Sequence, residues 1–210
     1  EPACVYFSGA HEAYRHLDEP VTTVRRKVFY LRGAYWILID RVTADTDAAH
    51  CYDLHFHVMP PAELETDGRA RTQGEGGNLL IIPAAGGRDE AALEPCPFPL
   101  DGYDNPLHLT YSHTDSGRAL FVTVLVPFTG SVPPVSAGLE AIHADDRELD
   151  PWEATGLVIE LNGRTDHYVD WHVPWHLPWT LGPCVGNRRV FHSCVHDGAA
   201  TTRSKYFETE

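Results

Sequence analysis

The chain has 210 residues, of which 43% are hydrophobic and 22% are charged, a composition typical of a globular protein that buries a sizeable core. Its 30 acidic side chains outnumber 16 basic ones and give a net charge of −14, which argues against general affinity for nucleic acid. No apolar run approaches the roughly 18 residues of a membrane-spanning helix, so we expect no membrane partner. The chain begins at Glu1 without a visible signal peptide, which predicts a mature product or an excised piece.

Strand-like segments rich in Val, Ile, Leu, Tyr and Trp follow one another along the chain, separated by turn residues. They cover residues 21–31, 34–42, 50–58, 78–82, 107–113, 119–128, 156–161 and 166–173. Tight turns are expected at residues 31–34 and at Asn162 and Gly163. No segment carries the apolar stripe of a helix, and no repeat is evident. The sequence therefore predicts an all-β fold, an antiparallel β-sandwich or barrel, as a single domain over 1–210.

Two segments interrupt this pattern. Residues 83–106 are rich in Pro and Gly and predict a long excursion, and loops of that length are often functional. Residues 172–184 hold three prolines and two tryptophans after the last predicted strand. The five cysteines show no CxxC spacing, which excludes zinc-ribbon and redox motifs. A disulfide between Cys184 and Cys194 is one interpretation, and buried thiols are the one we favour.

One carboxylate, Asp40, lies in an otherwise apolar strand that we expect to be covered on both faces. The next strand places Cys51, Asp53, His55 and His57 on a single face. If the two strands pair antiparallel across residues 43–49, Asp40 and His57 approach each other. A carboxylate and imidazoles suit Zn²⁺, so Asp40, His57 and His55 are candidate ligands. In the alternative, Asp40 caps a turn or pairs with an arginine, and the histidines are surface residues.

Three further patterns suggest other chemistry. A basic cluster beside the Asp40 strand, Arg25, Arg26, Lys27 and Arg32, is most simply a solvated face. The HxH pattern of His55 and His57, followed by Glu63, is compatible with a cupin-like metal site. Aromatic side chains near the C-terminal end could instead stack on sugar rings or belong to the core. These aromatic residues are Trp152, Tyr168, Trp171, Trp175 and Trp179.

An ordered set of short motifs resembles the C-terminal β-sandwich of heparinase II/III-like polysaccharide lyases. The motifs are HEAYRHL (11–17), PV (20–21), RRKVF (25–29), YWILIDRV (35–42), LHFHV (54–58), VPF (126–128) and GRTD (163–166). The resemblance implies a large antiparallel β-sandwich of the supersandwich type. It also implies a two-domain enzyme whose N-terminal α/α toroid carries most catalytic residues and is missing from this chain.

The resemblance implies β-elimination of uronate-containing polysaccharide in the periplasm or outside the cell. In such lyases a base removes the C5 proton, and an acid, often tyrosine, protonates the leaving oxygen. Tyr52 is the tyrosine we assign to that acid role, and Arg25 and Arg26 are candidates to neutralise substrate carboxylates. The family's zinc is held by a histidine, an aspartate and a later histidine. Asp40 and His57 match the last two, whereas Thr23 stands where the first is expected.

Three hypotheses follow. In the first, the chain is the sandwich of such a lyase, inactive alone, with a structural metal at Asp40, His57 and His55. In the second, it is a non-catalytic carbohydrate-binding module that uses the aromatic residues 171–179. In the third, it is a cupin-like metal enzyme that uses His55, His57 and Glu63.

Overall fold

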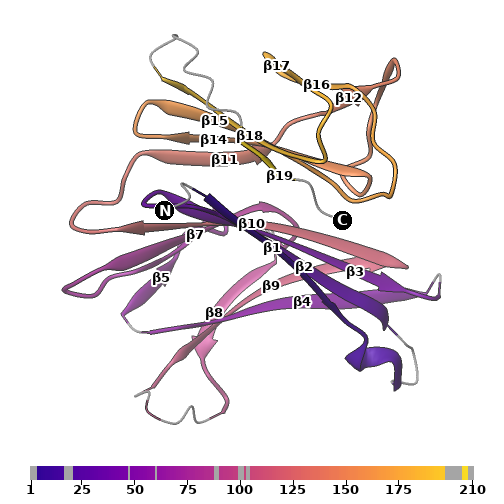
Figure 1. Cartoon of the computed structure of the whole chain (residues 1–210). Helices are drawn as coiled ribbons and strands as arrows, with labels where there is room; N and C mark the ends of the chain where they lie inside the picture. The colour runs from indigo at the N-terminus through magenta and orange to yellow at the C-terminus, as the bar shows by residue number, and fades with distance from the viewer. Residues whose placement is uncertain are drawn as a thin grey trace. The chain divides into compact units, whose positions relative to one another are not determined.

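A computed structural model describes residues 4–16, 21–46, 48–59, 61–87, 90–98, 102, 105–196 and 205–207. These residues are mostly β-strand, and the strands described pair antiparallel, which confirms the predicted all-β class (Figure 1). The chain divides into two compact units, Glu1–Val132 and Pro133–Glu210. The single domain over 1–210 stays a prediction. Within the described residues, no helix is long and apolar enough to cross a membrane.

The first unit contains two antiparallel sheets and one short 3₁₀ helix, η1 (Ala13–His16). The seven-stranded sheet runs, in spatial order, β1 (Cys4–His11), β2 (Val21–Leu31), β3 (Tyr35–Ala44), β10 (Arg118–Phe128), β7 (Asn78–Ala85), β6 (Ala70–Thr72) and β5 (Ala62–Leu64). The three-stranded sheet runs β4 (Ala49–Val58), β9 (Leu107–Ser116) and β8 (Ala91–Pro95).

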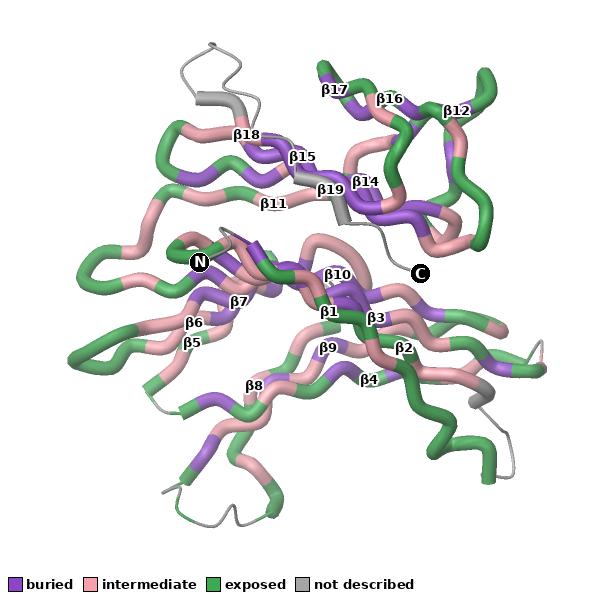
Figure 2. Tube along the Cα trace, viewed as in Figure 1, coloured by how far each residue is buried: buried purple, intermediate pink, exposed green. Residues whose placement is uncertain are grey.

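The core of this unit lies between its two sheets. Leu54, Leu109 and Tyr111 of the three-stranded sheet pack with Ile81 and Phe121 of the seven-stranded sheet. Along β4, buried positions alternate with exposed ones, as expected for a strand covered on one face (Figure 2). In β3, by contrast, both faces are largely buried, which confirms the expectation of a central strand.

One pairing prediction is wrong. β3 does not pair with β4 across the short connection between them; its neighbours are β2 and β10, whereas β4 pairs with β9 in the other sheet. The reason is burial. Because β3 is apolar on both faces, it needs a central position with a partner strand on each side. β4 is exposed on one face, so it fits the edge of the three-stranded sheet.

The second unit also contains two sheets. The five-stranded sheet runs β11 (Val135–Leu139), β14 (Ala154–Leu161), β15 (Arg164–Trp171), β18 (Val190–His196) and β19 (Lys205–Phe207). The four-stranded sheet runs β13 (Arg147–Glu148), β12 (His143–Ala144), β16 (Trp179–Leu181) and β17 (Cys184–Gly186). Asn162 and Gly163, with φ of 52° and 77°, form the predicted β14–β15 turn, in which both central residues need positive φ.

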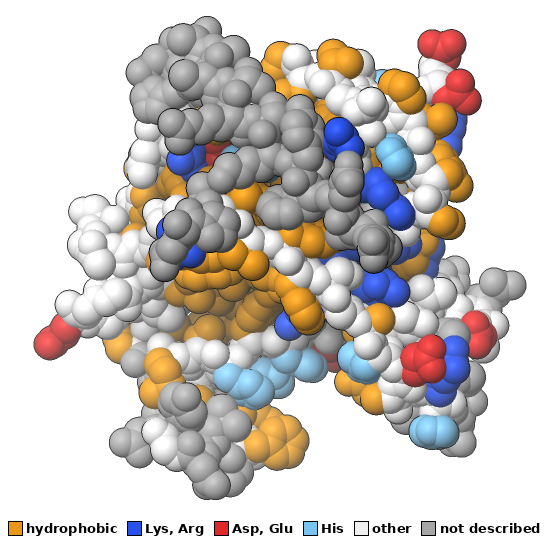
Figure 3. All heavy atoms as spheres, in the orientation of Figure 1, with side chains coloured by type: hydrophobic (Ala, Val, Ile, Leu, Met, Phe, Trp, Pro, Cys, Tyr) orange, Lys and Arg blue, Asp and Glu red, His pale blue; other side chains and the backbone are white. Residues whose placement is uncertain are grey.

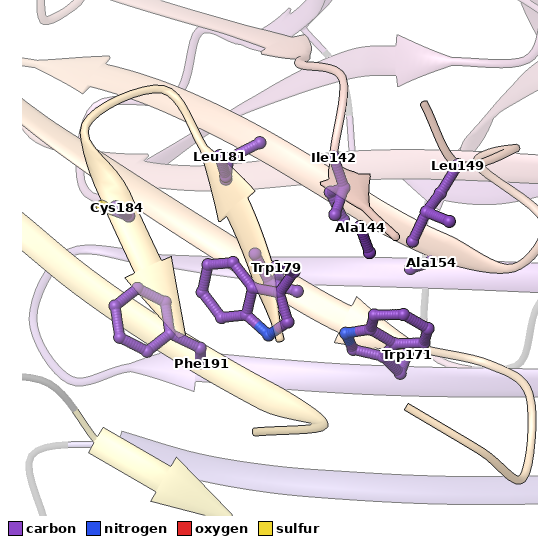
Figure 4. Close-up of a cluster of buried hydrophobic side chains, with 10 residues drawn as sticks. Ile142, Ala144, Leu149, Ala154, Trp171, Trp179, Leu181, Cys184 and Phe191 are labelled. Carbon is purple, nitrogen blue, oxygen red and sulfur yellow. The ribbon is translucent and has the colours of Figure 1, made fainter. Parts of the chain in front are cut away.

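Aromatic side chains between these two sheets form the core of the second unit (Figure 4). Trp179 meets Phe191 edge-on with ring centroids 5.0 Å apart, and Trp171 lies 2% exposed in the same cluster. Gly186 is required here because a Cβ at that position would overlap the Trp179 indole ring. The sugar-stacking interpretation is therefore wrong for Trp171, Trp179 and Tyr168, since all three are buried.

Two loop predictions also need correction. Residues 83–106 contain a strand, β8, and residues 172–184 contain β16. Both strands are short and bounded by Pro or Gly, so their composition hides them. None of the five cysteines, all within the described residues, forms a disulfide, but only Cys4 and Cys184 are the buried thiols that we expected; Cys51 is exposed. The Cys184 thiol instead faces the Ser193 hydroxyl at 3.8 Å.

Candidate functional site

Asp40 lies in the middle of the seven-stranded sheet and is paired with an arginine. The register of β2 and β3 sets Arg26 directly opposite Asp40, and β10 sets Phe121 on its other side. Arg26 donates from Nε to Oδ1 at 2.6 Å and from Nη2 to Oδ2 at 3.1 Å. Burial raises the pKa of Asp40 above its ordinary value, and the hydrogen bonds and charge of Arg26 oppose that shift. The Asp40 side chain is 6% exposed and that of Arg26 is 45% exposed, so the pair presents its cationic end to solvent.

A pocket of about 630 Å³ opens over this ion pair, within the first unit. It lies between the β1–β2–β3 side of the seven-stranded sheet and β4, the edge strand of the three-stranded sheet. Its volume falls in the range of small-ligand sites, about 300–1,000 Å³. Phe7 and Tyr14 lie at its surface, Phe121 and Tyr52 contribute to its walls, and Arg26 belongs to its lining. We call this cavity the edge pocket.

Tyr52, the candidate catalytic acid, lines the edge pocket but is only 6% exposed. Its hydroxyl is buried and has no hydrogen-bond partner among the described residues. Burial, followed by the negative charge of Asp115, raises the pKa of Tyr52, which favours the protonated phenol that an acid needs. Its role as an acid stays a prediction.

The two predicted imidazole ligands lie on the outer face of the three-stranded sheet. His57 is directly opposite His108 of β9, and their rings stack with centroids 5.1 Å apart. His55 approaches the same His108 ring at 4.5 Å and contacts the Thr110 hydroxyl at 3.2 Å. Glu94 of β8 is the other neighbour of His108 in register. In Figure 3, pale-blue histidine side chains gather over this sheet.

Burial lowers the pKa of His108, and the nearby His55 and His57 lower it further, against the attraction of Asp53 and Glu94. We call His55, His57 and His108 the histidine cluster. The sequence contained its signal, since His108 alternates with buried Leu109 just as His55 alternates with Leu54. What the sequence did not show was that β4 and β9 are partners.

Asp40, His55 and His57 do not form the predicted zinc site in this structure. Both carboxylate oxygens of Asp40 accept hydrogen bonds from Arg26, and a guanidinium at that position repels a divalent cation. His57 faces His108 instead of Asp40. Within the described residues, no three His, Cys, Asp or Glu side chains form a group that could hold a metal ion. The arrangement of Asp40, His55 and His57 therefore does not fit the zinc site that the family resemblance implies. Zinc stays a prediction.

The two candidate substrate-binding arginines separate in the structure. Arg26 lines the edge pocket, whereas Arg25 is the adjacent residue of the same strand and projects to the opposite face. The Nη1 atom of Arg25 donates to the Ser8 hydroxyl at 3.4 Å. A joint role of Arg25 and Arg26 in one site is therefore not supported by their geometry.

The cupin-like set is not assembled either. Glu63 lies on β5 of the seven-stranded sheet, and its carboxylate accepts hydrogen bonds from Arg71 at 2.8 Å and Gln73 at 2.7 Å. His55 and His57 lie on β4 of the other sheet. The third hypothesis thus lacks its carboxylate ligand.

The fold and the edge pocket define an all-β antiparallel sandwich with a small-ligand cavity at a sheet edge. The family model described as "Heparinase II/III-like, C-terminal" matches residues 2–134, and the chain belongs to that family. No curated protein matches the chain at a significant level.

Solved structures show the same fold. The chain is similar to a structure titled heparinase III, with 20% identity, a TM-score of 0.59, and coverage of 82% of this chain and 26% of that chain. It is also similar to the heparan sulfate lyase HepC from Pedobacter heparinus, with 16% identity, a TM-score of 0.59, and coverage of 82% and 27%. The chain thus spans about a quarter of the length of these proteins.

Proposed function

We propose that this chain is the C-terminal β-sandwich portion of a polysaccharide lyase that cleaves an acidic, uronate-containing polysaccharide by β-elimination. Membership of the heparinase II/III C-terminal family is the observation that carries the proposal. The similarity to a heparinase III and to a heparan sulfate lyase makes heparan-type chains the first substrates to test.

The chain acts as one part of a larger catalyst. It covers 26–27% of the similar solved chains, which leaves room for an N-terminal α/α toroid in the whole protein. In this proposal the toroid supplies most groups that remove the C5 proton and protonate the leaving oxygen. The sandwich supports the cleft, and Tyr52 is its candidate for the acid. Acidic polysaccharide is extracellular material, so we place the protein in the periplasm or outside the cell.

The experiment begins with the coding sequence upstream of Glu1. If it encodes a helical region, the longer product should release unsaturated uronate from heparan sulfate, followed by ultraviolet absorbance, and should leave a neutral polysaccharide intact. The 210-residue chain alone should release none. A longer product that folds but cleaves no uronate-containing polysaccharide would overturn the proposal.

A further inference from the structure

Two aromatic side chains at the mouth of the edge pocket are more exposed than packing requires. Phe7 of β1 is 60% exposed and Tyr14 of η1 is 48% exposed. Both line the pocket. Exposed apolar side chains that gather beside a pocket with polar lining are typical of ligand-binding or interaction sites. The two rings therefore indicate a recognition surface at the mouth of the pocket.

The positions of both rings are built by neighbouring residues. A Cβ at Gly9 would lie 3.1 Å from Cζ of Phe7, so glycine gives the Phe7 ring room to lie along its own strand. Gly9 is also the register partner of Arg26. The Tyr14 ring leans against His11, with centroids 5.5 Å apart and planes tilted by 58°. The rings of Phe7 and Tyr14 thus line the same pocket as the guanidinium of Arg26.

The polar groups of the pocket, which include the imidazoles of His11 and His55, offer hydrogen bonds, and the fixed charges among its described lining residues carry no net positive charge. Arg26 is neutralised by Asp40, and Asp53 adds a further carboxylate, held by the Ser112 hydroxyl at 2.6 Å. The Tyr52 hydroxyl in the wall has no partner among the described residues. A sulfated or carboxylated ring would meet the Asp53 carboxylate while Arg26 is already paired with Asp40, whereas a neutral ring avoids that repulsion.

We propose that the edge pocket is a binding subsite for a neutral sugar ring, with Phe7 and Tyr14 stacking on its apolar face and the exposed guanidinium of Arg26 donating to its hydroxyl groups. Sugars present a C–H face to aromatic rings and hydroxyl groups at their edges, which matches this distribution of apolar and polar lining. That the ligand is a sugar rests on the proposed function; the pocket and its preference for a neutral ligand do not.

The test is titration of this 210-residue chain with N-acetylglucosamine, with the disaccharide N,N′-diacetylchitobiose and with glucuronate, followed by NMR or calorimetry. We expect saturable binding of the neutral sugars and weaker binding of glucuronate. Phe7→Ala and Tyr14→Ala should each weaken neutral-sugar binding roughly two- to tenfold. Phe98→Ala is the matched control, since Phe98 is 67% exposed but does not line the pocket.

Arg26→Met should abolish neutral-sugar binding. Arg25→Met, which changes the opposite face of the strand, should leave neutral-sugar binding unchanged. Because Arg26→Met also removes the partner of buried Asp40, the two aromatic variants provide the test that does not depend on folding. No saturable binding by the wild-type chain, tighter binding of glucuronate, or equal weakening by Phe98→Ala would overturn the proposal. Failure of the lyase assay with binding retained would instead remove only the proposed function.

Discussion

The carboxylate of Asp40 has lost nearly all contact with water, and the guanidinium of Arg26 supplies the hydrogen bonds that water would otherwise make. The two oxygens are held at 2.6 and 3.1 Å, so removal of Arg26 would leave a buried group unpaired. At Asp40 the edge pocket differs from the metal site that the family resemblance implies, because Arg26 binds both oxygens of the carboxylate.

Replacement of Arg26 should destabilise the protein in a pH-dependent way. Arg26→Met is expected to lower the free energy of unfolding by about 1–3 kcal/mol at pH 7, a value below that of a fully buried pair because the arginine side chain is 45% exposed. Burial raises the pKa of Asp40, so without Arg26 the folded state favours the protonated acid. The loss should therefore shrink as the pH falls toward the ordinary aspartate pKa of 3.8.

Urea denaturation at pH 7 and at pH 4.5 measures this difference. Arg25→Met provides the control, since Arg25 projects from the opposite face and donates a hydrogen bond to the Ser8 hydroxyl. Equal losses for the two variants, or a loss for Arg26→Met that grows on acidification, would contradict the interpretation.

Removal of metal should not affect the edge pocket. Because Arg26 already neutralises Asp40, a divalent ion gains little there and suffers repulsion from the guanidinium. We expect EDTA to leave the midpoint of thermal unfolding of the wild-type chain unchanged. Added Zn²⁺ should shift the midpoint of the Asp40→Asn variant no differently from that of the wild type. A fall in the midpoint with EDTA that Asp40→Asn abolishes would restore the zinc site.

At the scale of elements, the histidine cluster lies on strands β4 and β9 of the three-stranded sheet. The pKa of His108 is lowered by burial and by its two imidazole neighbours, so the folded state binds its proton less readily than the unfolded chain. This contribution to stability is present above the ordinary histidine pKa of 6.5 and is lost as the pH falls below it.

His108→Gln should accordingly flatten the decline in stability between pH 6.5 and pH 5. The change is measured by urea denaturation across that range, with His143→Gln, an exposed imidazole of β12, as the control. A profile for His108→Gln that follows the wild type throughout would show that His108 does not titrate with unfolding.

Strand positions were predictable from sequence because alternation is a local property. Residues 21–31 form β2 with the expected bounds, and the face shared by His55 and His57 is the one expected. Sheet partners were not predictable, since β3 takes β10 as a neighbour from far along the chain. The zinc prediction depended on that missing information, whereas an arginine partner for Asp40 had been an open alternative.

At the scale of the whole molecule, each unit has a core of its own, and the second core depends on aromatic residues. Trp179 is 1% exposed, whereas Trp175 is 44% exposed. Trp179→Ala should cost about 3–5 kcal/mol in unfolding free energy. Trp175→Ala should cost no more than about 1 kcal/mol. Chemical denaturation of both variants checks this, and a similar loss for both would mean that the exposed indole has a structural role.

The adjacency of β3 and β10 has a consequence for biogenesis. β3, which is largely buried on both faces, has no neighbour on its β10 side until Phe121 and the residues around it have been synthesised. Until then β3 exposes apolar surface in the nascent chain. Because the segment between β3 and β10 is long, their pairing is slow. Folding of the first unit should thus depend on chaperones during translation.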